Sequence, residues 1–143
     1  MAYRDTKIKL DDYRERIAAL RAEMRALQAA VEPEQVEDYK FSSVDGPVHL
    51  SALFGDHNEL IMIHNMGAGC IYCTLWADGF NGIRDHLENR AAFVVSSPDA
   101  PDAQQEFATG RGWRFRMVSH AGTNYAENTG NRLKPCYCNA FGF

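Results

Sequence analysis

The sequence Leu60-Ile61-Met62-Ile63, followed by Gly67-Ala68-Gly69 and Cys70-Ile71-Tyr72-Cys73, decides the fold of this chain. The four apolar residues are typical of a short strand that is buried on both faces of a sheet. The glycines favour a sharp turn, because glycine adopts backbone angles that other residues avoid. An apolar side then recurs at helical spacing, through Leu75, Trp76, Phe80, Ile83 and Leu87. The order is therefore strand, turn, C-x-x-C and helix, with both cysteines at or just inside the start of the helix.

This position favours thiol chemistry at the two cysteines. The free N–H groups and the dipole at a helix N-terminus stabilise an anion, so a thiolate forms more readily there. The thiolate is the nucleophile in disulfide exchange. We expect Cys70 to be the more exposed of the two and to attack, and Cys73, one turn later, to close the disulfide. A C-x-x-C placed in this order is typical of thioredoxin-like redox proteins.

The segment from Gly69 to Gly82, with the sequence GCIYCTLWADGFNG, resembles the signature of a bacterial thioredoxin-like family of unknown function. Its members are regarded as predicted dithiol-disulfide oxidoreductases. The most specific part is Trp-Ala-Asp-Gly-Phe-Asn-Gly, and the resemblance extends from about Tyr13 onward. It includes Tyr39-Lys40-Phe41, Asp45-Gly46-Pro47-Val48, Leu53-Phe54-Gly55, Phe93-Val94-Val95-Ser96, Gly112-Trp113 and Asn124-Tyr125. The resemblance implies a thioredoxin fold and a redox-active pair at Cys70 and Cys73.

Composition narrows the range of functions. The chain has 143 residues, 45% hydrophobic and 24% charged, which suits one globular domain with a proper core. A net charge of −4 gives no reason to expect nucleic acid or a membrane as partner. No segment is long and apolar enough to span a membrane, and the N-terminus lacks a signal-peptide core, so we expect a cytoplasmic protein. Cytoplasmic thiols are mostly reduced, so the four cysteines suggest redox or metal chemistry.

The first 33 residues are predicted to form a separate amphipathic helix, from about Asp5 to Ala30, that ends before Pro33. Apolar residues alternate at spacings of three and four: Leu10, Tyr13, Ile17, Leu20, Met24, Leu27 and Val31. This heptad seam indicates either packing on the chain's own domain or, slightly favoured, pairing with a second copy in a homodimer.

Residues 34–143 are expected to form the thioredoxin-like domain, an α/β fold with a central mixed sheet flanked by helices. Phe41-Ser42-Ser43 and Val48-His49-Leu50 flank the turn sequence Asp45-Gly46-Pro47, which predicts a hairpin before the first core strand. Further elements are a strand at 91–95, a helix at 102–109, a strand at 113–118 and a loop at 121–132. Gly79 and Gly82 mark a kink in the helix after Cys73 or its close packing against another backbone. The β-α-β connections predict parallel central strands.

The end of the chain carries a second pair of cysteines. A thioredoxin-like fold places a cis-proline beside the C-x-x-C, and Pro135 stands where this proline is expected. Cys136 and Cys138 follow it. A full domain of this kind continues through a strand pair and a closing helix, for which the sequence lacks room. The C-terminal elements are therefore expected to be short or truncated: either the N-terminal elements or a partner chain cover the exposed edge, or the sequence is truncated.

Three functions are compatible with these residues. The preferred hypothesis is an enzyme that exchanges the Cys70/Cys73 dithiol with the disulfide of a protein or small molecule, without a cofactor. A variant lets Cys136 or Cys138 relay the disulfide. The second is a zinc or iron–sulfur site formed by all four cysteines, Cys70, Cys73, Cys136 and Cys138. The third is a dimeric, non-enzymatic thioredoxin-like binding module.

Other side chains are assigned supporting parts. His64 ends the central strand and His120 a later one, so both are expected at the carboxyl edge of the sheet, where either could stabilise a thiolate or relay a proton. More often, such a histidine is structural. Asp78 is read as a hydrogen-bond acceptor for nearby backbone, with a buried proton acceptor as the alternative. Trp76 is expected in the core.

Overall fold

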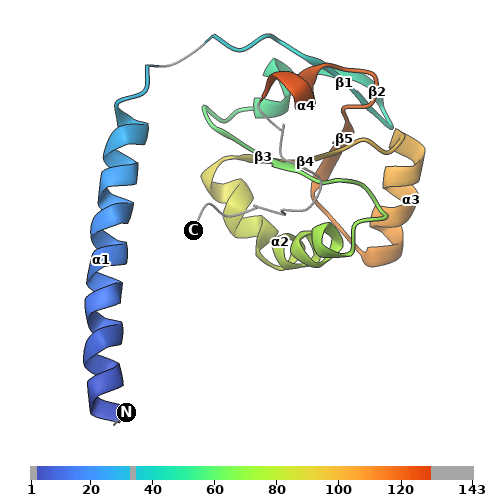
Figure 1. Cartoon of the computed structure of the whole chain (residues 1–143). Helices are drawn as coiled ribbons and strands as arrows, with labels where there is room; N and C mark the ends of the chain where they lie inside the picture. Colours follow the sequence, from blue (N-terminus) through green and yellow to red (C-terminus); the bar gives the residue numbers. More distant parts are fainter. Residues whose placement is uncertain (1–2, 33–34, 130–143) are drawn as a thin grey trace. The chain divides into compact units, whose positions relative to one another are not determined.

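A computed structural model of the chain describes residues 3–32 and 35–129 (Figure 1). The chain divides into two compact units, Met1–Val36 and Glu37–Phe143. Each unit is described by itself. Within the described residues, no helix has both the length and the apolar composition needed to cross a membrane.

The N-terminal unit is the helix α1, Tyr3–Ala29. None of its residues is buried, and the seam is exposed throughout, from 47% at Leu10 to 72% at Leu27. On the polar side, Asp11 accepts hydrogen bonds from Lys7 and Arg14, both at 2.7 Å. These exposed pairs stabilise the helix only slightly. The helix is therefore amphipathic, with an apolar seam and a polar side.

The second unit is built on a five-stranded mixed sheet with the order β2-β1-β5-β4-β3. The strands are β1 (Lys40–Ser43), β2 (Gly46–His49), β3 (Leu60–His64), β4 (Ala92–Ser97) and β5 (Arg116–Ser119). β3, β4 and β5 are parallel, whereas β1 runs antiparallel to both β2 and β5. The predicted hairpin, parallel centre and mixed α/β sheet are confirmed.

Helices cover both faces of this sheet. α2 (Ile71–Arg90) and α3 (Pro101–Arg111) connect the parallel strands and lie on the same side (Figure 1). The 3-10 turn η1 (Ser51–Phe54) and the short helix α4 (Tyr125–Asn128) lie on the other side. Gly112 ends α3 with a φ of 69°, a left-handed conformation that glycine adopts without strain.

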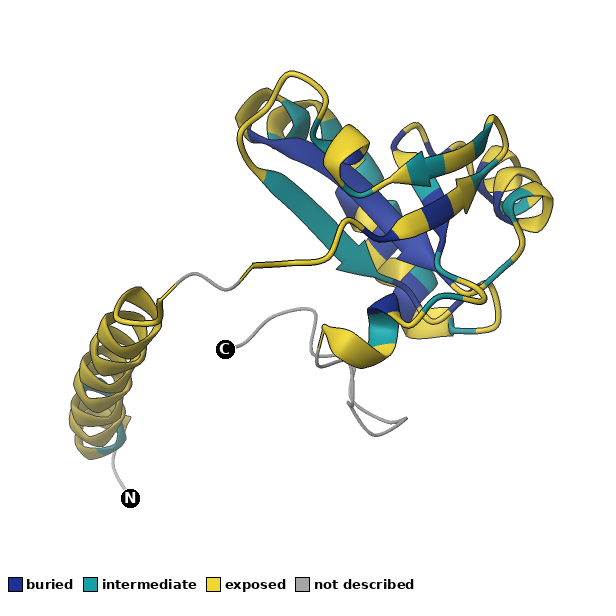
Figure 2. Cartoon of the chain, turned by 90° about the horizontal axis from the view of Figure 1, so that it is seen from above, coloured by how far each residue is buried: buried dark blue, intermediate teal, exposed yellow. Residues whose placement is uncertain are grey.

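Strand β4 supplies side chains to two apolar cores because successive residues of a strand point to opposite faces. Phe93 and Val95 pack with Ala77, Phe80, Ala108, Trp113 and Phe115 beneath α2 and α3. Val94 packs on the opposite face with Tyr39, Phe41, Leu53, Val118 and Tyr125. All six residues of β4 are buried, and it forms the blue centre of the sheet in Figure 2.

Strand β3 differs from the sequence-based expectation. It lies at the edge of the sheet formed by the described residues, and all five of its residues are only partly buried (Figure 2). The prediction that Leu60–Ile63 is buried on both faces is wrong for this reason. An apolar run reports the preference of side chains for burial, but it does not reveal whether a strand has one neighbour or two.

Local details also differ from expectation. The hairpin turn is Val44-Asp45, because Ser43 pairs with Gly46 and Ser42 with Pro47. The loop expected at 121–132 contains α4, and β5 begins only at Arg116. Helix α2 continues through Gly79 and Gly82, and neither glycine has a neighbouring atom within 4 Å of an added Cβ. The proposed close packing of these glycines is therefore wrong.

Candidate active site

The turn between β3 and α2 brings the cysteines to the carboxyl edge of the sheet. The backbone N–H of Gly67 donates to Oδ1 of Asn65 at 2.8 Å, and the N–H of Cys70 donates to the carbonyl of Gly67 at 3.0 Å. Gly67 has a φ of 100°, which a residue with a side chain rarely adopts. The N–H of Asn65 donates to the carbonyl of Ser96 at 2.8 Å, so the turn begins anchored to β4.

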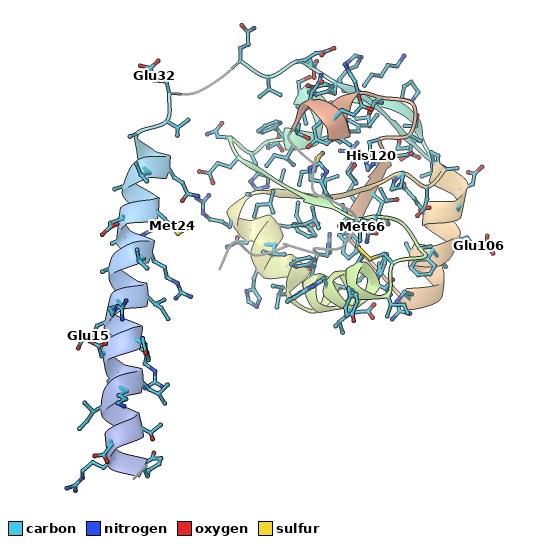
Figure 3. All side chains as sticks on the ribbon, in the orientation of Figure 1. Glu15, Met24, Glu32, Met66, Glu106 and His120 are labelled. Atoms are coloured by element: carbon cyan, nitrogen blue, oxygen red, sulfur yellow. A yellow bond between two sulfur atoms is a disulfide. The ribbon has the colours of Figure 1, made fainter. Side chains whose placement is uncertain are left out.

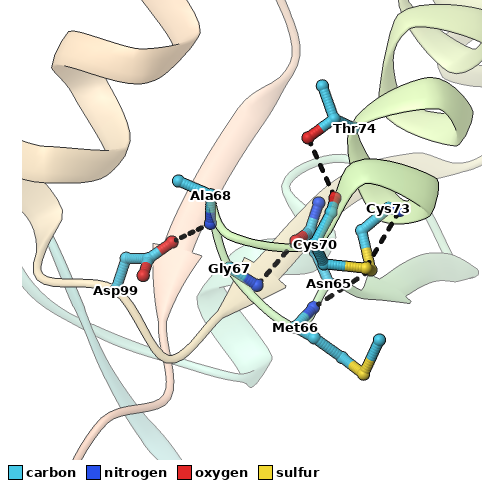
Figure 4. The surroundings of a disulfide bond; sticks show 8 residues. All are labelled: Asn65, Met66, Gly67, Ala68, Cys70, Cys73, Thr74 and Asp99. Carbon is cyan, nitrogen blue, oxygen red and sulfur yellow. Dashed lines mark hydrogen bonds between the residues drawn. A yellow bond between two sulfur atoms is a disulfide. The ribbon is translucent and has the colours of Figure 1, made fainter. Parts of the chain in front are cut away.

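Cys70 and Cys73 form a disulfide at the start of α2 (Figures 3 and 4), with their Cα atoms 5.3 Å apart. Cys70 is the N-cap of the helix, and its Sγ accepts a hydrogen bond from the N–H of Cys73 at 3.1 Å. A donor at this position favours the anionic form of a sulfur once the disulfide is reduced. The cap therefore gives Cys70 the environment that stabilises a sulfur anion.

The two sulfurs differ in their surroundings. Cys73 is only 9% exposed, and its Sγ lies 3.5 Å from the backbone N–H of Met66, whereas Cys70 is half-buried. The residues between them, Ile71 and Tyr72, are 82% and 68% exposed. Other exposed apolar side chains in the same segment are Met66, Leu75 and Trp76. An incoming substrate would therefore meet an apolar surface beside Cys70.

Asp99 reaches this turn from the segment that follows β4 (Figure 4). Its Oδ2 accepts a hydrogen bond from the backbone N–H of Ala68 at 2.9 Å. On its other side, Asp99 interacts with Ser97, whose hydroxyl is 3.3 Å from both Oδ2 and the backbone nitrogen of Asp99. Buried Gln104 in turn donates to the Ser97 hydroxyl at 2.8 Å. The turn is thus connected to α3 through side chains.

A second polar cluster lies where the parallel strands end. His64 stacks on Tyr125 with an interplanar angle of 8°, and its Nε2 is 3.3 Å from the tyrosine hydroxyl. His120 Nδ1 is 2.7 Å from the hydroxyl of Ser96. Burial, and secondly the nearby His120, lower the pKa of His64, and its buried Nδ1 has no hydrogen-bond partner among the described residues. Burial also lowers the pKa of His120, against an opposing effect of Asp99. Both rings therefore favour the neutral form more than an ordinary histidine does.

Asp78 fastens the middle of α2 to the segment after α3. Its carboxylate accepts hydrogen bonds from the Arg111 guanidinium and, at 2.8 Å, from the indole N–H of Trp113. One turn later, Asn81 donates to the carbonyl of Gly112 at 3.0 Å and accepts from the N–H of Arg114 at 2.9 Å. Asp78 and Asn81, the polar residues of the Trp-Ala-Asp-Gly-Phe-Asn-Gly segment, therefore connect α2 to the end of α3 and the segment that follows it.

These contacts correct two predictions about individual residues. Asp78 is partly exposed and bonds distant side chains, so neither a buried proton acceptor nor a bond to nearby backbone describes it. Hydrogen bonds from Arg111, and then from Trp113, lower the pKa of Asp78. Trp76 is 40% exposed, so it does not lie in the core as expected, although it stacks on Phe80 at 6.5 Å.

Part of the predicted site falls outside the described residues. The structure does not describe Pro135, Cys136 or Cys138. The predicted cis-proline, the disulfide relay and half of the four-cysteine metal site therefore lie outside the described residues. Residues 3–32 and 35–129 contain no cis peptide bond and no group of three or more His, Cys, Asp or Glu that could hold a metal ion.

Several residues of the site were not predicted from the sequence. Asn65, Ser97 and Asp99 were not singled out, and Tyr125 was noted without a role. The position of Asp99, directly after a buried strand in a parallel sheet, was the available signal, because such residues meet at the carboxyl edge of the sheet.

Sequence comparison identifies the family of this chain. Residues 5–139 match the family described as bacterial protein of unknown function, DUF899. The chain belongs to this family. No curated protein sequence matches the chain.

Solved structures similar to this chain support the fold. They include the peroxidoxin BcpB from Mycobacterium tuberculosis, with 27% sequence identity and a TM-score of 0.52. This match covers 60% of the present chain and 56% of the mycobacterial one, so the chain spans little more than half the length of that relative. The bacterioferritin comigratory protein of Xanthomonas campestris matches at 20% identity, with a TM-score of 0.56, over 80% of this chain and 71% of that chain. These similarities show that the chain has a thioredoxin-like α/β fold.

Proposed function

We propose that the chain is a thiol-disulfide oxidoreductase that uses Cys70 as attacking thiolate and Cys73 as resolving thiol. The observation that carries the proposal is the disulfide at the N-terminus of α2, with half-buried Cys70 as the N-cap and Cys73 buried behind it. The fold shared with peroxidoxin-type proteins supports redox chemistry at this edge of the sheet.

The exchange proceeds in two balanced steps. The Cys70 thiolate attacks one sulfur of a substrate disulfide and forms a mixed disulfide, while the second substrate sulfur leaves as a thiolate and takes up a proton. Cys73 then loses its proton and attacks the Cys70 sulfur, which releases the first substrate sulfur as a second thiol. The substrate disulfide is reduced by two electrons, and the enzyme dithiol becomes the Cys70–Cys73 disulfide seen here.

A second candidate reaction is peroxide reduction, which is favoured by the similarity to a peroxidoxin. In that case, the Cys70 thiolate attacks a peroxide oxygen, the O–O bond breaks and Cys70 becomes a sulfenic acid. The other peroxide oxygen leaves, takes up a proton and is released as an alcohol or water. Cys73 then displaces water from the sulfenic acid and forms the same disulfide. Both reactions need an external thiol to restore the dithiol.

Single cysteine variants test the exchange. Cys70→Ser is expected to abolish turnover with a disulfide substrate, and Cys73→Ser to accumulate a mixed disulfide at Cys70 that is detected as an intact mass. The Cys136→Ser/Cys138→Ser double variant is the matched control and should retain activity. Full activity in both single variants would refute the mechanism. Bound zinc or iron that protects all four thiols would favour the metal site, whereas unreactive thiols without metal would favour a binding module.

Redox titration places the pair on the known scale. A reversible Cys70–Cys73 disulfide between roughly −270 and −120 mV is expected, the range covered by known thiol oxidoreductases. Parallel assays with an organic hydroperoxide and with a disulfide, each with the same reductant, decide which oxidant is used. We propose that the reaction takes place in the cytoplasm, where thiols that regenerate the dithiol are abundant.

We further propose that α1 pairs with a second copy of the chain. Six of the seven seam residues, Leu10 to Leu27, lie in α1 and follow a heptad pattern, and none of the residues of α1 is buried. Light scattering should give the mass of a dimer at micromolar concentration, and Leu20→Lys, in the middle of the seam, should give a monomer. A wild-type monomer, with α1 packed on its own domain or free, would refute the pairing.

A further inference from the structure

Asp99 stands outside the C-x-x-C segment and nevertheless bonds the turn that carries it. We propose that Asp99 is a positioning residue, which holds the Gly67–Cys70 turn so that Cys70 stays at the N-cap of α2. The inference rests on the proposed thiol chemistry and deepens it. It assigns to Asp99 a geometric role, exerted through the backbone of Ala68.

The hydrogen bonds at Asp99 form a chain from the protein interior to the turn. Gln104, only 3% exposed, donates to the carbonyl of Val118 at 3.0 Å and to the hydroxyl of Ser97 at 2.8 Å. Ser97, 1% exposed, interacts with Asp99, which accepts from Ala68. The inner members of this chain have little freedom, because they are buried and bonded to two strands and a helix. The carboxylate is therefore supported on the side away from the turn.

Gly67 shows how closely the turn approaches this carboxylate (Figure 4). A Cβ built on Gly67 would lie 2.8 Å from Oδ1 and 3.0 Å from Oδ2 of Asp99. Real Cβ atoms essentially never approach an oxygen so closely, so any side chain at position 67 would displace the carboxylate or the turn. The absence of a side chain at Gly67 thus allows Asp99 to reach the N–H of Ala68.

The contact matters because the other bonds at the centre of the turn are local. The N–H groups of Gly67 and Cys70 bond to Asn65 and Gly67, which belong to the same segment. The bond from Ala68 to Asp99 crosses to a segment 31 residues away in sequence. When it is lost, Ala68 can move relative to β4, and Cys70, two residues later, can leave its cap position. The thiolate then loses the N–H of Cys73 as a donor.

A competing effect of Asp99 has the opposite sign. A carboxylate near a thiolate disfavours the thiolate by like-charge repulsion, so removing the charge alone would make Cys70 more reactive. Geometry and charge are separated by three substitutions. Asp99→Asn keeps an acceptor oxygen and loses the charge, Asp99→Glu keeps the charge and moves the carboxylate by one methylene, and Asp99→Ala loses both.

The test measures how fast iodoacetamide alkylates Cys70 in the full chain, with Cys73→Ser in every variant to prevent disulfide formation. Peptide mass spectrometry reports Cys70 as a function of pH. We expect Asp99→Ala and Asp99→Glu to lower the rate at pH 7 by about two- to fivefold, the effect of a helix terminus on one charge, and to raise the pH midpoint. Asp99→Asn should stay close to the parent. Asp102→Ala, on α3 three residues away, is the control and should not change the rate.

The pattern across the variants decides the outcome. If Asp99→Asn accelerates alkylation and Asp99→Glu leaves it unchanged, the charge alone acts and the positioning role is refuted. Parent-like rates in all three variants also refute it. Should Asp99→Ala fail to fold, the contrast between Asn and Glu still decides. The measurement needs no substrate, so a protein without oxidoreductase activity would refute the proposed function and leave this result standing.

Discussion

Substitution of Asp78 tests most directly how α2, the helix that begins at the two cysteines, is held in place. In Asp78→Ala, the indole N–H of Trp113 loses its acceptor, although the Trp113 side chain is only 8% exposed. A buried donor left without a partner costs about 1–3 kcal/mol. The ion pair with Arg111 is exposed, so we assign it little of the loss. We expect Asp78→Ala to lower the free energy of unfolding by about 1–3 kcal/mol, mainly through Trp113.

Urea denaturation of reduced protein, followed by circular dichroism, measures this loss. Trp113→Phe removes the indole N–H and keeps an aromatic ring, so a double-mutant cycle isolates the contact. Asp78→Ala should cost clearly less in the Trp113→Phe background than in the wild type. Asp85→Ala is the matched control, because Asp85 lies on the same helix and its 70% exposed side chain pairs with Arg84 and Arg114. It should change stability by less than about 0.5 kcal/mol.

The same contact predicts a dependence on pH. The pKa of Asp78 is lower in the folded protein than its ordinary value, because Arg111 and Trp113 bond the charged form. The contribution of Asp78 to stability is therefore complete above the ordinary pKa and is lost as the pH falls through the folded value. Wild type and Asp78→Asn should converge in stability in acid. If Asp78→Ala costs nothing at pH 7, or if the cycle shows no coupling, Asp78 does not fasten α2 as argued.

Two further predictions concern the turn and the histidine cluster. Gly67→Ala should slow Cys70 alkylation as Asp99→Ala does, because a Cβ occupies the place of the Asp99 carboxylate; an unchanged rate would contradict the contact. For His64, a folded pKa below the ordinary value means that the unfolded chain binds the proton more tightly, so stability should fall as the pH drops below about 6.5. Urea midpoints from pH 5 to 8 should show a shallower slope in His64→Gln; an equal slope would refute the assignment.

The sequence predicts the fold where the physics is local. Glycines after an apolar run indicate a strand that ends in a turn, and the apolar side from Leu75 to Leu87 indicates α2. Such patterns report backbone freedom and the periodicity of side chains, which act within about ten residues. The alternation of strands and helices then leads to parallel strands, because a crossover helix returns the chain in the same direction.

Local sequence patterns do not predict contacts between segments that are distant in the chain. Asp78 and Trp113 are 35 residues apart, and each alone has several plausible partners. The edge position of β3 in the sheet of the described residues depends on strand order, which a pattern of β-α-β units does not determine. The role of Asp99 depends on Gly67 approaching it in space, which no local sequence pattern indicates.

The two contacts that hold α2 and the turn before it both involve residues at or next to the ends of α3. Asp99 binds the turn before α2, and Trp113 and Arg111 bind Asp78 in the middle of the helix. Asp99 lies just before α3 (Pro101–Arg111), Arg111 is its last residue, and Trp113 follows it. Helix α3 therefore connects the contact at Asp99 with the contact at Asp78, although it contributes no cysteine. A change that shifts α3 along the sheet would disturb both the N-cap position of Cys70 and the hydrogen bonds of Asp78. A change confined to one of the two contacts would leave the other in place.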